Sequence, residues 1–220
     1  MNSALSYFFT DRTGGFSSGS YESLNFAGHV GDDPLKVKAN RATLPTTQFM
    51  NQVHGNAVVV VTQYSEIEPT CDALVTANPD ISLAVMVADC IPLLLVSESV
   101  VGAVHVGRAG LVNRVAINSI EAMRDLGAKH IHAVLGPSIC GKCYEVPLGL
   151  QEEVTANHPD SHSTTRHSTP ALDLQAGLVA ELMAQDVSFE ASTICTMENA
   201  SYFSHRRQSP TGRFVGVVKI

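Results

Sequence analysis

The chain has 220 residues, and its content of 45% hydrophobic and 16% charged residues is typical of a globular protein with a well-buried core. A formal net charge of −7 argues against duplex nucleic acid or an anionic membrane as its main partner. The five widely spaced cysteines do not resemble a secreted disulfide framework, and the N-terminal sequence does not resemble a secretory signal, so we expect a cytoplasmic protein.

The first predicted element is a strand at residues 5–10, and a long loop rich in Gly, Ser, Asp and Asn follows it. Loops of this length without periodicity are usually functional or disordered. One interpretation is therefore a mobile surface segment. In the functional interpretation, Arg12, Asn25 and His29 are the side chains of this loop that could reach a ligand.

An Asp-Pro pair at residues 33–34 predicts the start of a helix that runs to about Ala42, because Asp is favoured at the N-cap and Pro at the first helical position. Residues 47–61 predict two short strands that meet at a Gly-Asn turn. His54 would then lie at a strand end, where its side chain could face a cleft. Residues 71–76 predict a further short strand.

Two nearly continuous apolar runs, residues 81–88 and 100–106, predict strands that are covered on both faces. Asp89, Cys90 and His105 lie within or beside these runs, where a polar group must be paired, neutral or functional. An acid and a proline interrupt the longest apolar run, which argues against a membrane span.

The second apolar run ends in a glycine-rich turn, HVGRAG, and a helix is predicted at residues 111–126, with Gly127 as its stop. Such a turn before a helix N-terminus could hold an anion on free backbone N–H groups. A strand is predicted next, at residues 130–135.

The last third of the chain alternates helices and strands. Helices are predicted at residues 148–157 and at 173–184 with an Asp cap, a polar loop at 158–170 separates them, and strands follow at 191–195 and 214–220. No repeat or change of composition marks a domain boundary. We therefore expect one domain of mixed helices and strands, α+β or α/β.

The side chains of His54, Cys90 and His105 are a candidate metal site. A thiolate and two neutral imidazoles are good zinc ligands and leave a fourth position open for water or substrate. Their long spacing matches no compact metal-binding motif, and a lone His or Cys in an apolar run is more often structural. The case rests on the expectation that all three residues end strands beside turns.

Other motifs point less clearly to chemistry. Cys140 and Cys143 form a C-x-x-C pair, but the Tyr-Glu-Val-Pro that follows does not predict the helix start of a redox motif, so a structural role is favoured. The nine histidines include a single H-x-H pair, too few for a multicopper cluster. The sequence contains no G-x-S-x-G, Walker A or G-x-G-x-x-G pattern.

Several segments together resemble one known family. They are, in order, DRTGGFSSGSYESLNFAGHVGDD, NQVHG, CDALVT, ADCIPLLL, GAVHVGRAG, GPSIC followed by CYEV, and CT with FSHRR and TGR. From Thr10 to Arg213, this ordered set resembles the laccase-domain family, first described as polyphenol oxidases and later recognised as purine nucleoside phosphorylases. The resemblance implies an α+β fold over residues 1–220, a single-domain α-β-β-α layered sandwich with mixed sheets.

The resemblance also implies zinc bound by His54, Cys90 and His105, with copper less favoured. The activity it implies is phosphorolysis of adenosine, inosine, guanosine and methylthioadenosine, with adenosine deamination as a second reaction. Purine nucleosides and phosphate are therefore the expected partners, rather than nucleic acid or a membrane.

One position departs from the family pattern. The family motif is usually H-A-G-W-R-G or H-A-G-R-R-G, whereas this sequence has H-V-G-R-A-G, with Ala109 in place of the second Arg position. If the family Arg contacts phosphate or substrate, its loss could weaken the activity or change its range. Arg108 could substitute from the neighbouring position, although it would point in a different direction.

The remaining roles concern a proton and an anion. Besides the three metal ligands, Asp89 is a candidate catalytic residue that could orient a ligand or move a proton, although it could also simply cap a strand. The candidate substrate-binding residues are Arg12, Arg41, Arg108 and Arg206 for anions and Asn25 for the ribose hydroxyls.

Two alternatives remain open. The first is a non-catalytic nucleoside-binding or partner protein on the same scaffold, which Ala109 motivates and which binding without phosphate-dependent turnover would favour. The second is a hydrolase with Cys90 as nucleophile and His105 as base. A covalent intermediate on zinc-free protein would favour the hydrolase.

Overall fold

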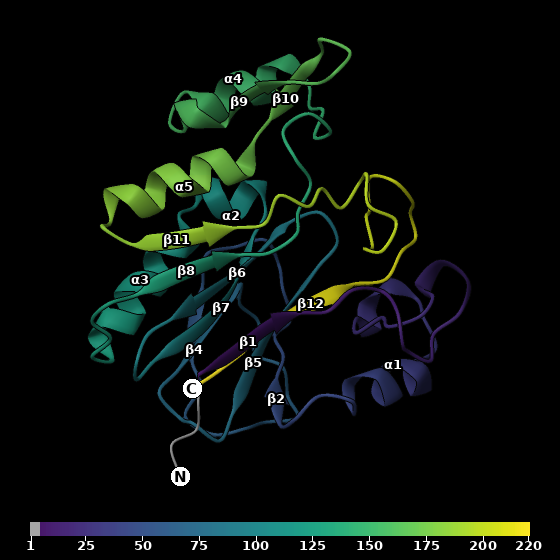
Figure 1. Cartoon of the computed structure of the whole chain (residues 1–220), viewed down its shortest axis with the longest axis vertical. Helices are drawn as coiled ribbons and strands as arrows, with labels where there is room; N and C mark the ends of the chain where they lie inside the picture. Colours follow the sequence, from purple (N-terminus) through teal and green to yellow (C-terminus); the bar gives the residue numbers. More distant parts are fainter. Residues whose placement is uncertain (1–4) are drawn as a thin grey trace.

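The computed structural model describes residues 5–220, and most of its strands form two sheets that face each other (Figure 1). The four-stranded sheet has the order β1 (Ser6–Phe9), β12 (Phe214–Lys219), β5 (Ser82–Val87) and β2 (Thr47–Gln48). The six-stranded sheet has the order β11 (Ser188–Ala191), β8 (His132–Leu135), β6 (Ile91–Val96), β7 (Val101–Val106), β4 (Ala73–Thr76) and β3 (Val58–Val60). Both sheets contain parallel and antiparallel pairs.

The alternation of side chains along the central strands produces the layers. In β5, Leu83, Val85 and Val87 point between the two sheets, whereas Ala84 and Met86 point to the opposite face. Strands β6 and β7 alternate in the same way between the space shared by the sheets and the space beneath the helices. Because both faces are covered, these strands are apolar at almost every position, as the sequence indicated.

The helices complete the outer layers. Helices α2 (Arg108–Val112), α3 (Val115–Asp125) and α5 (Leu174–Ala184) lie on the six-stranded sheet, and α1 (Pro34–Arg41) lies at the other side of the molecule (Figure 1). Helix α4 (Leu148–Thr155) packs against a separate hairpin of β9 (His162–Thr164) and β10 (Pro170–Leu172). The arrangement is the α-β-β-α sandwich with mixed sheets that the family resemblance implied.

Two predicted helix starts are confirmed by their caps. The Asp33 carboxylate accepts a hydrogen bond from the N–H of Leu35 at 2.9 Å, and that of Asp173 accepts one from the N–H of Ala176 at 3.0 Å.

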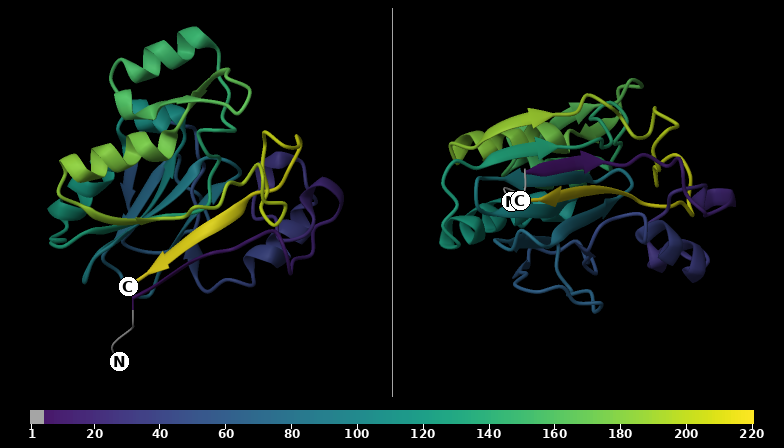
Figure 2. Two further views of the ribbon diagram at one scale, coloured as in Figure 1. Left: turned by 45° about the horizontal axis from the view of Figure 1, so that its top comes forward. Right: turned by 60° about the horizontal axis from the view of Figure 1, so that its bottom comes forward.

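The first and last strands, β1 and β12, run side by side (Figure 2). Within residues 5–220, every helix is too short or too polar to cross a bilayer.

The single helix predicted at residues 111–126 is wrong. The structure has two helices, α2 and α3, because Arg114 adopts a left-handed φ of 61° that ends one helix and starts the next. Helix α2 also begins earlier than predicted, at Arg108, directly after the glycine of the turn.

Four further predictions need correction. The two central strands predicted between residues 81 and 106 are three, because IPLLLV forms β6 despite its proline. The predicted loop at 158–170 contains β9 and the start of β10, which pair through their backbones despite polar side chains. The strand predicted at 191–195 ends at residue 191, where its pairing with β8 stops. The two strands of residues 47–61 do not meet, since β2 and β3 belong to different sheets.

Candidate metal centre

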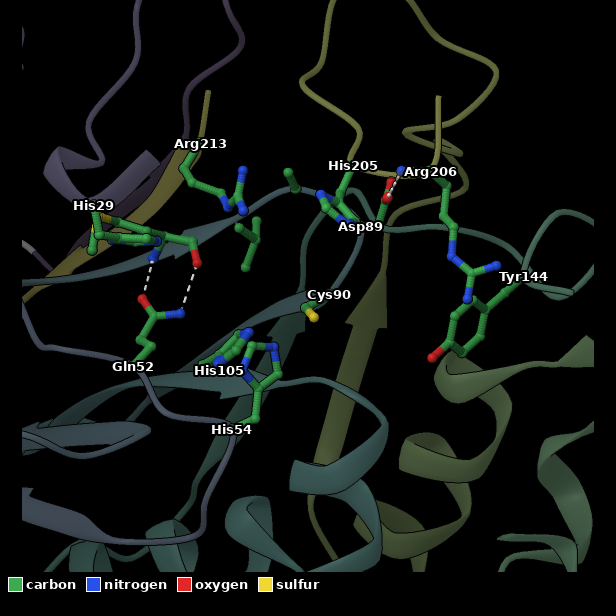
Figure 3. Close-up of a pocket in the computed structure, with 13 residues that line it drawn as sticks. His29, Gln52, His54, Asp89, Cys90, His105, Tyr144, His205, Arg206 and Arg213 are labelled. Carbon is green, nitrogen blue, oxygen red and sulfur yellow. Dashed lines mark hydrogen bonds between the residues drawn. The ribbon is translucent and has the colours of Figure 1, made fainter. Parts of the chain in front are cut away.

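Three chain segments bring His54, Cys90 and His105 together at one edge of the sandwich (Figure 3). His105 lies near the end of β7, Cys90 precedes β6, and His54 lies on the connection between the two sheets. The candidate ligand atoms of these three side chains all lie within 4.8 Å of one another. The chain therefore assembles one thiol and two imidazoles that are far apart in sequence.

The backbone at this edge is strained where the side chains converge. His54 and Asp89 both have left-handed φ values, 60° and 96°, which non-glycine residues adopt rarely. Strained residues of this kind cluster at functional sites, where the surrounding structure holds them in place. Here the two left-handed residues turn the chain so that the side chain of His54 and that of Cys90, which follows Asp89, point into the same space.

The buried carboxylate of Asp72 fixes both histidines. Its Oδ1 lies 2.8 Å from Nδ1 of His105 and accepts a hydrogen bond from the His54 N–H at 2.9 Å. Its Oδ2 accepts one from the Gly55 N–H at 2.6 Å. Burial alone would raise the pKa of Asp72, but these donors lower it below the usual value, so the carboxylate is charged. With Nδ1 of His105 held by Asp72, Nε2 is left free for the site.

Gly107 lets the thiol and His54 approach the turn after β7. A Cβ at this position would lie 2.9 Å from Sγ of Cys90 and 3.3 Å from Cδ2 of His54. The sequence indicated that this turn could hold an anion, and this stays a prediction. Gly107 itself makes room for two candidate metal ligands.

The charges of the group favour metal binding. Burial would raise the pKa of the Cys90 thiol, but the charge and hydrogen bonds of His105 and His54 lower it to about 6. Burial would lower the pKa of His105, but Cys90 and Asp72 raise it to about 9. A thiolate already forms at neutral pH, and a carboxylate already orients one imidazole, as in many zinc sites. The proton that the raised pKa keeps on His105 is released when a metal binds. The residues present therefore fit a thiolate-binding and imidazole-binding metal.

The three side chains open into a cavity of about 460 Å³, a volume in the range of small-molecule sites. Arg206 and Arg213 lie across the cavity from His54 and His105 (Figure 3). The cavity is lined by His29, Gln52, His54, Met86, Val87, Ala88, Asp89, Cys90, His105, Tyr144, His205, Arg206 and Arg213.

Arg206 and Arg213 give the cavity a cationic wall. Arg213 donates to the carbonyls of Thr211 and Gly212, and Arg206 donates to the carbonyl of Glu145. Burial lowers the pKa of Arg213, against the nearby negative charges of Cys90 and Asp89. Among residues 5–220, neither guanidinium forms an ion pair with a carboxylate, so both can receive an anionic ligand.

Asp89 joins the metal side of the cavity to the arginine side. Its Oδ1 accepts a hydrogen bond from the Thr196 hydroxyl and its Oδ2 accepts one from the Arg206 N–H, each at 2.7 Å. Its carbonyl accepts the N–H of Ile139 at 2.9 Å. Asp89 therefore positions the segment that carries Arg206.

Tyr144 forms the side wall next to Arg206. The Arg206 guanidinium lies over the Tyr144 ring, 4.7 Å from its centre. Burial and the Cys90 charge raise the pKa of the Tyr144 hydroxyl, although Arg206 and Arg108 oppose the shift. The hydroxyl is therefore protonated at neutral pH and can donate a hydrogen bond.

Four of the five predicted substrate-binding residues lie outside this cavity, and two of the four are Arg12 and Arg41. Arg12 donates to the carbonyl of Glu22 and lies over the Phe203 ring, so its guanidinium stabilises the long N-terminal loop. Arg41 pairs with Glu68 at 2.5 Å. For these two arginines, partners within the fold take the charge that the prediction had assigned to an anion.

Asn25 is fully buried away from the cavity. Its side chain binds the backbone of Ala27 and Arg213 and the carboxylate of Asp32, so it stabilises the loop rather than facing a ribose. Arg108 and Ala109 are half-buried in α2 and do not line the cavity, so the family substitution at Ala109 lies outside it. His29 and Arg206 do line it.

Several residues of the site were not predicted from the sequence. Gln52 makes two hydrogen bonds with the backbone of Met86, at 2.8 and 2.9 Å, and ties the His54 segment to β5. Asp72, Tyr144 and Arg213 were also missed. The available signal for Asp72 was an acid next to an apolar strand, the same signal that identified Asp89.

Residues 6–220 match the family described as multi-copper polyphenol oxidoreductase laccase. A Streptomyces coelicolor protein named purine nucleoside phosphorylase is 44% identical over 225 residues, covering 96% of this chain and 93% of its own. A Mycobacterium tuberculosis protein of the same name is 42% identical, covering 95% of this chain and 89% of its own.

Two solved structures share the fold. A Neisseria meningitidis protein of the DUF152 family superposes with a TM-score of 0.90 at 30% identity, covering 99% of this chain and 95% of its own. YlmD from Geobacillus stearothermophilus superposes with a TM-score of 0.89 at 28% identity, covering 99% of this chain and 92% of its own. The whole described chain thus has structural counterparts.

Proposed function

Because the chain belongs to the multi-copper polyphenol oxidoreductase laccase family, and similar relatives are named purine nucleoside phosphorylases, we propose that it is a zinc-dependent purine nucleoside phosphorylase. Its substrates are adenosine, inosine, guanosine and methylthioadenosine with phosphate, and its second reaction is adenosine deamination. We also propose a single domain over residues 1–220 and a cytoplasmic location, which the five free thiols support.

One observation carries this proposal. The group of His54, Cys90 and His105 opens into a cavity whose opposite wall carries the unpaired guanidiniums of Arg206 and Arg213. A metal side and an anion side facing one space suit a reaction between a nucleoside and phosphate. A binding protein for nucleosides alone has no need of the cationic wall.

Phosphorolysis makes defined demands on these residues. A phosphate oxygen attacks the anomeric carbon of ribose, the bond to the purine nitrogen breaks, and the purine takes up a proton. Arg206 and Arg213 hold the phosphate in position beside the ribose, and the proton taken up by the purine offsets the charge that moves to this leaving group. Tyr144 and Asp89 lie beside this path, Tyr144 as a hydrogen-bond donor and Asp89 as the residue that positions Arg206.

The metal group suits the second reaction. Zinc, when bound, acts as a Lewis acid toward water or substrate. His54, Cys90 and His105 hold and orient it, and Asp72 keeps His105 in the tautomer that presents Nε2. Deamination replaces the purine amine with water and releases ammonia, so it needs no phosphate.

The donor set favours zinc over copper. Multicopper oxidases need clusters of histidines. Among residues 5–220 there are two metal-compatible groups: the one at the cavity contains two histidines, and the other contains none. A thiolate and two imidazoles are ligand types that zinc takes, and as three protein ligands they leave a fourth position open, as in catalytic zinc sites. Elemental analysis of protein purified without added metal tests this point, and bound copper without zinc would contradict it.

Product analysis tests the proposed activity. Protein of known zinc content is incubated with adenosine, with and without phosphate. Adenine and ribose 1-phosphate that form only with phosphate are the expected products, and inosine is the product of the second reaction. Cys90→Ala should remove both activities together with the metal. Full activity of metal-free Cys90→Ala protein would contradict the mechanism.

A second candidate function rests on the pairing of Cys90 with His105. The pKa of Cys90 is lowered to about 6, as in enzymes with a cysteine nucleophile and a histidine partner. In a hydrolase of this kind, the thiolate forms a covalent intermediate. Mass spectrometry of zinc-free protein after incubation with nucleoside distinguishes the two candidates, because a covalent adduct on Cys90 is expected only for the hydrolase.

A further inference from the structure

A second group of metal-compatible side chains lies outside the cavity described above. It consists of Cys140, Cys143, Cys195 and Glu198, and their candidate ligand atoms all lie within 4.8 Å of one another. We propose that this cysteine-rich group binds a divalent, thiolate-preferring metal ion of the zinc class as a structural site. The proposal does not depend on the reaction catalysed at the cavity.

The four ligands come from two turns of the same design. In the first turn, the Cys143 N–H donates to the carbonyl of Cys140 at 2.9 Å. In the second, the Glu198 N–H donates to the carbonyl of Cys195 at 3.2 Å. Each turn separates its two ligands by two residues and directs both side chains to one side. Structural zinc sites are commonly assembled from two such pairs.

Backbone contacts hold the two turns against each other. Ser138 pairs with Cys195, donating to the carbonyl of Ile194 at 3.3 Å and accepting from the N–H of Thr196 at 3.0 Å. The N–H of Cys140 lies 3.4 Å from Sγ of Cys195 and donates to it. Backbone N–H groups that bind a cysteine sulfur are a usual second contact of metal-binding thiolates. The site is therefore largely formed before a metal arrives.

The spacing of the group fits a tetrahedral ion. With Zn–S bonds of about 2.3 Å, two sulfurs of a tetrahedral site lie about 3.8 Å apart. Ligand atoms within 4.8 Å of one another need to move inward by about 1 Å at most to reach that geometry. Rotation of the side chains of Cys143 and Glu198, which lie nearer the surface, can supply that movement.

The charges around the group also fit a dication. The Arg166 guanidinium lies 3.6 Å from Sγ of Cys143 and forms an ion pair with Glu198. Three thiolates and a carboxylate carry four negative charges, of which a dication offsets two and Arg166 a third. The thiols release their protons to solvent on binding.

A disulfide accounts for this group less well. All five cysteines of the chain are free thiols in the structure. A bond between any two of Cys140, Cys143 and Cys195 leaves the third thiol without a role and Glu198 with its ion pair to Arg166 alone. A metal ion uses all four groups, and C-x-x-C pairs in reducing compartments are commonly metal sites.

The proposed metal stabilises one wall of the cavity. Tyr144 directly follows Cys143 and lines the cavity. Thr196 directly follows Cys195 and donates its hydroxyl to Asp89 at 2.7 Å. An ion that joins the two turns therefore fixes Tyr144 and Asp89 relative to each other.

A metal titration tests the proposal without any substrate. Reduced, metal-free, full-length protein is titrated with Zn²⁺ against a chromophoric chelator. We expect two equivalents for the wild type, one for Cys143→Ser and one for Cys90→Ser. Cys71→Ala, the matched control at the cysteine outside both groups, should still bind two.

Two further measurements make the result decisive. Glu198→Gln, at an exposed position, should keep the fold and weaken the second equivalent at least tenfold. Cobalt bound to Cys90→Ser should give stronger thiolate charge-transfer absorption than cobalt bound to Cys143→Ser. The site that remains in Cys90→Ser has three thiolates, whereas the site that remains in Cys143→Ser has one. One equivalent in the wild type, unchanged in Cys143→Ser, overturns the proposal. So does an intact mass lower by two hydrogens in unreduced protein, which indicates a disulfide.

Discussion

Asp72 is the residue on which the geometry of both histidines depends most directly. Its carboxylate is fully buried and lies 2.8 Å from His105 Nδ1, and it accepts hydrogen bonds from the N–H groups of His54 and Gly55. A weaker hydrogen bond from Val53 reaches it at 3.3 Å. The replacement Asp72→Asn keeps the shape of this side chain and changes only its charge and one acceptor.

The expected magnitude follows from these contacts. If the amide oxygen of Asn keeps the hydrogen bonds that Oδ1 accepts, the amide N–H₂ takes the place of Oδ2. It then faces the N–H of Gly55, which donates to Oδ2 at 2.6 Å in the wild type, so two donors meet and this hydrogen bond is lost. Hydrogen bonds to charged groups contribute about 1.5–3 kcal/mol each, so we expect Asp72→Asn to lower the free energy of unfolding by about 3 kcal/mol. Metal affinity should fall about 10–100-fold, because groups that orient metal ligands have effects of this size.

Urea unfolding of the metal-free protein measures the first effect, and competition with a chelator measures the second. Asp125→Asn, at an exposed position in α3, is the matched control and should change neither quantity. The reasoning would be refuted if Asp72→Asn unfolds like the wild type and binds metal with unchanged affinity.

The pH dependence gives an independent test of the same residue. Donors from His105 and the backbone lower the pKa of Asp72 below its usual 3.8, despite burial. Its contribution to stability is therefore present above pH 3.8 and is lost as the pH falls through the folded-state pKa. Asp72→Asn should remove this part of the acid-induced loss of stability.

Three other replacements test separate parts of the structure. Gly107→Ala places a Cβ 2.9 Å from Sγ of Cys90 and should lower metal affinity at least tenfold in a chelator competition. Arg213→Gln should raise the KM for phosphate about tenfold or more while metal content stays unchanged, because it removes an unpaired charge from the cavity. Burial raises the pKa of the Glu181 carboxyl to about 7, and the Arg114 charge opposes this shift. The native state therefore loses stability as the pH rises from 4.5 to 7, because the buried carboxyl must ionise. Glu181→Gln should raise the melting temperature at pH 8 more than at pH 5.

The family and the fold were predictable from the sequence, and the comparisons confirm both. His54, Cys90 and His105 were found because polar, metal-binding residue types stand out in apolar strands, and the structure brings them together. The layered sandwich was implied by the family resemblance, and the residues themselves indicated central strands covered on both faces, because such strands lose the usual alternation of polar and apolar residues. The break at Arg114 was missed, since no glycine or proline marks it.

The contacts of charged residues were much less predictable. Arg12, Arg41 and Arg213 have the same chemistry, yet the first two satisfy partners in the fold and only the third lines the cavity. Nothing local in the sequence distinguishes these cases, because each depends on which distant segment lies opposite the side chain. The same reason explains why Asn25, on a glycine-rich loop, was expected at a ligand and is buried instead.

Asp89 shows how the position of one residue determines several features of the site. It has a left-handed φ of 96°, directly before Cys90, so the bend that presents the thiol also turns the Asp89 carboxylate toward the C-terminal segment. There it binds Thr196, next to Cys195, and the backbone of Arg206. The thiol, the cationic wall and the second cysteine group are thus all positioned from a single bend. A residue that only capped a strand would not need both carboxylate oxygens and its carbonyl to be engaged with other segments, and the rare backbone conformation of Asp89 is explained by this set of connections.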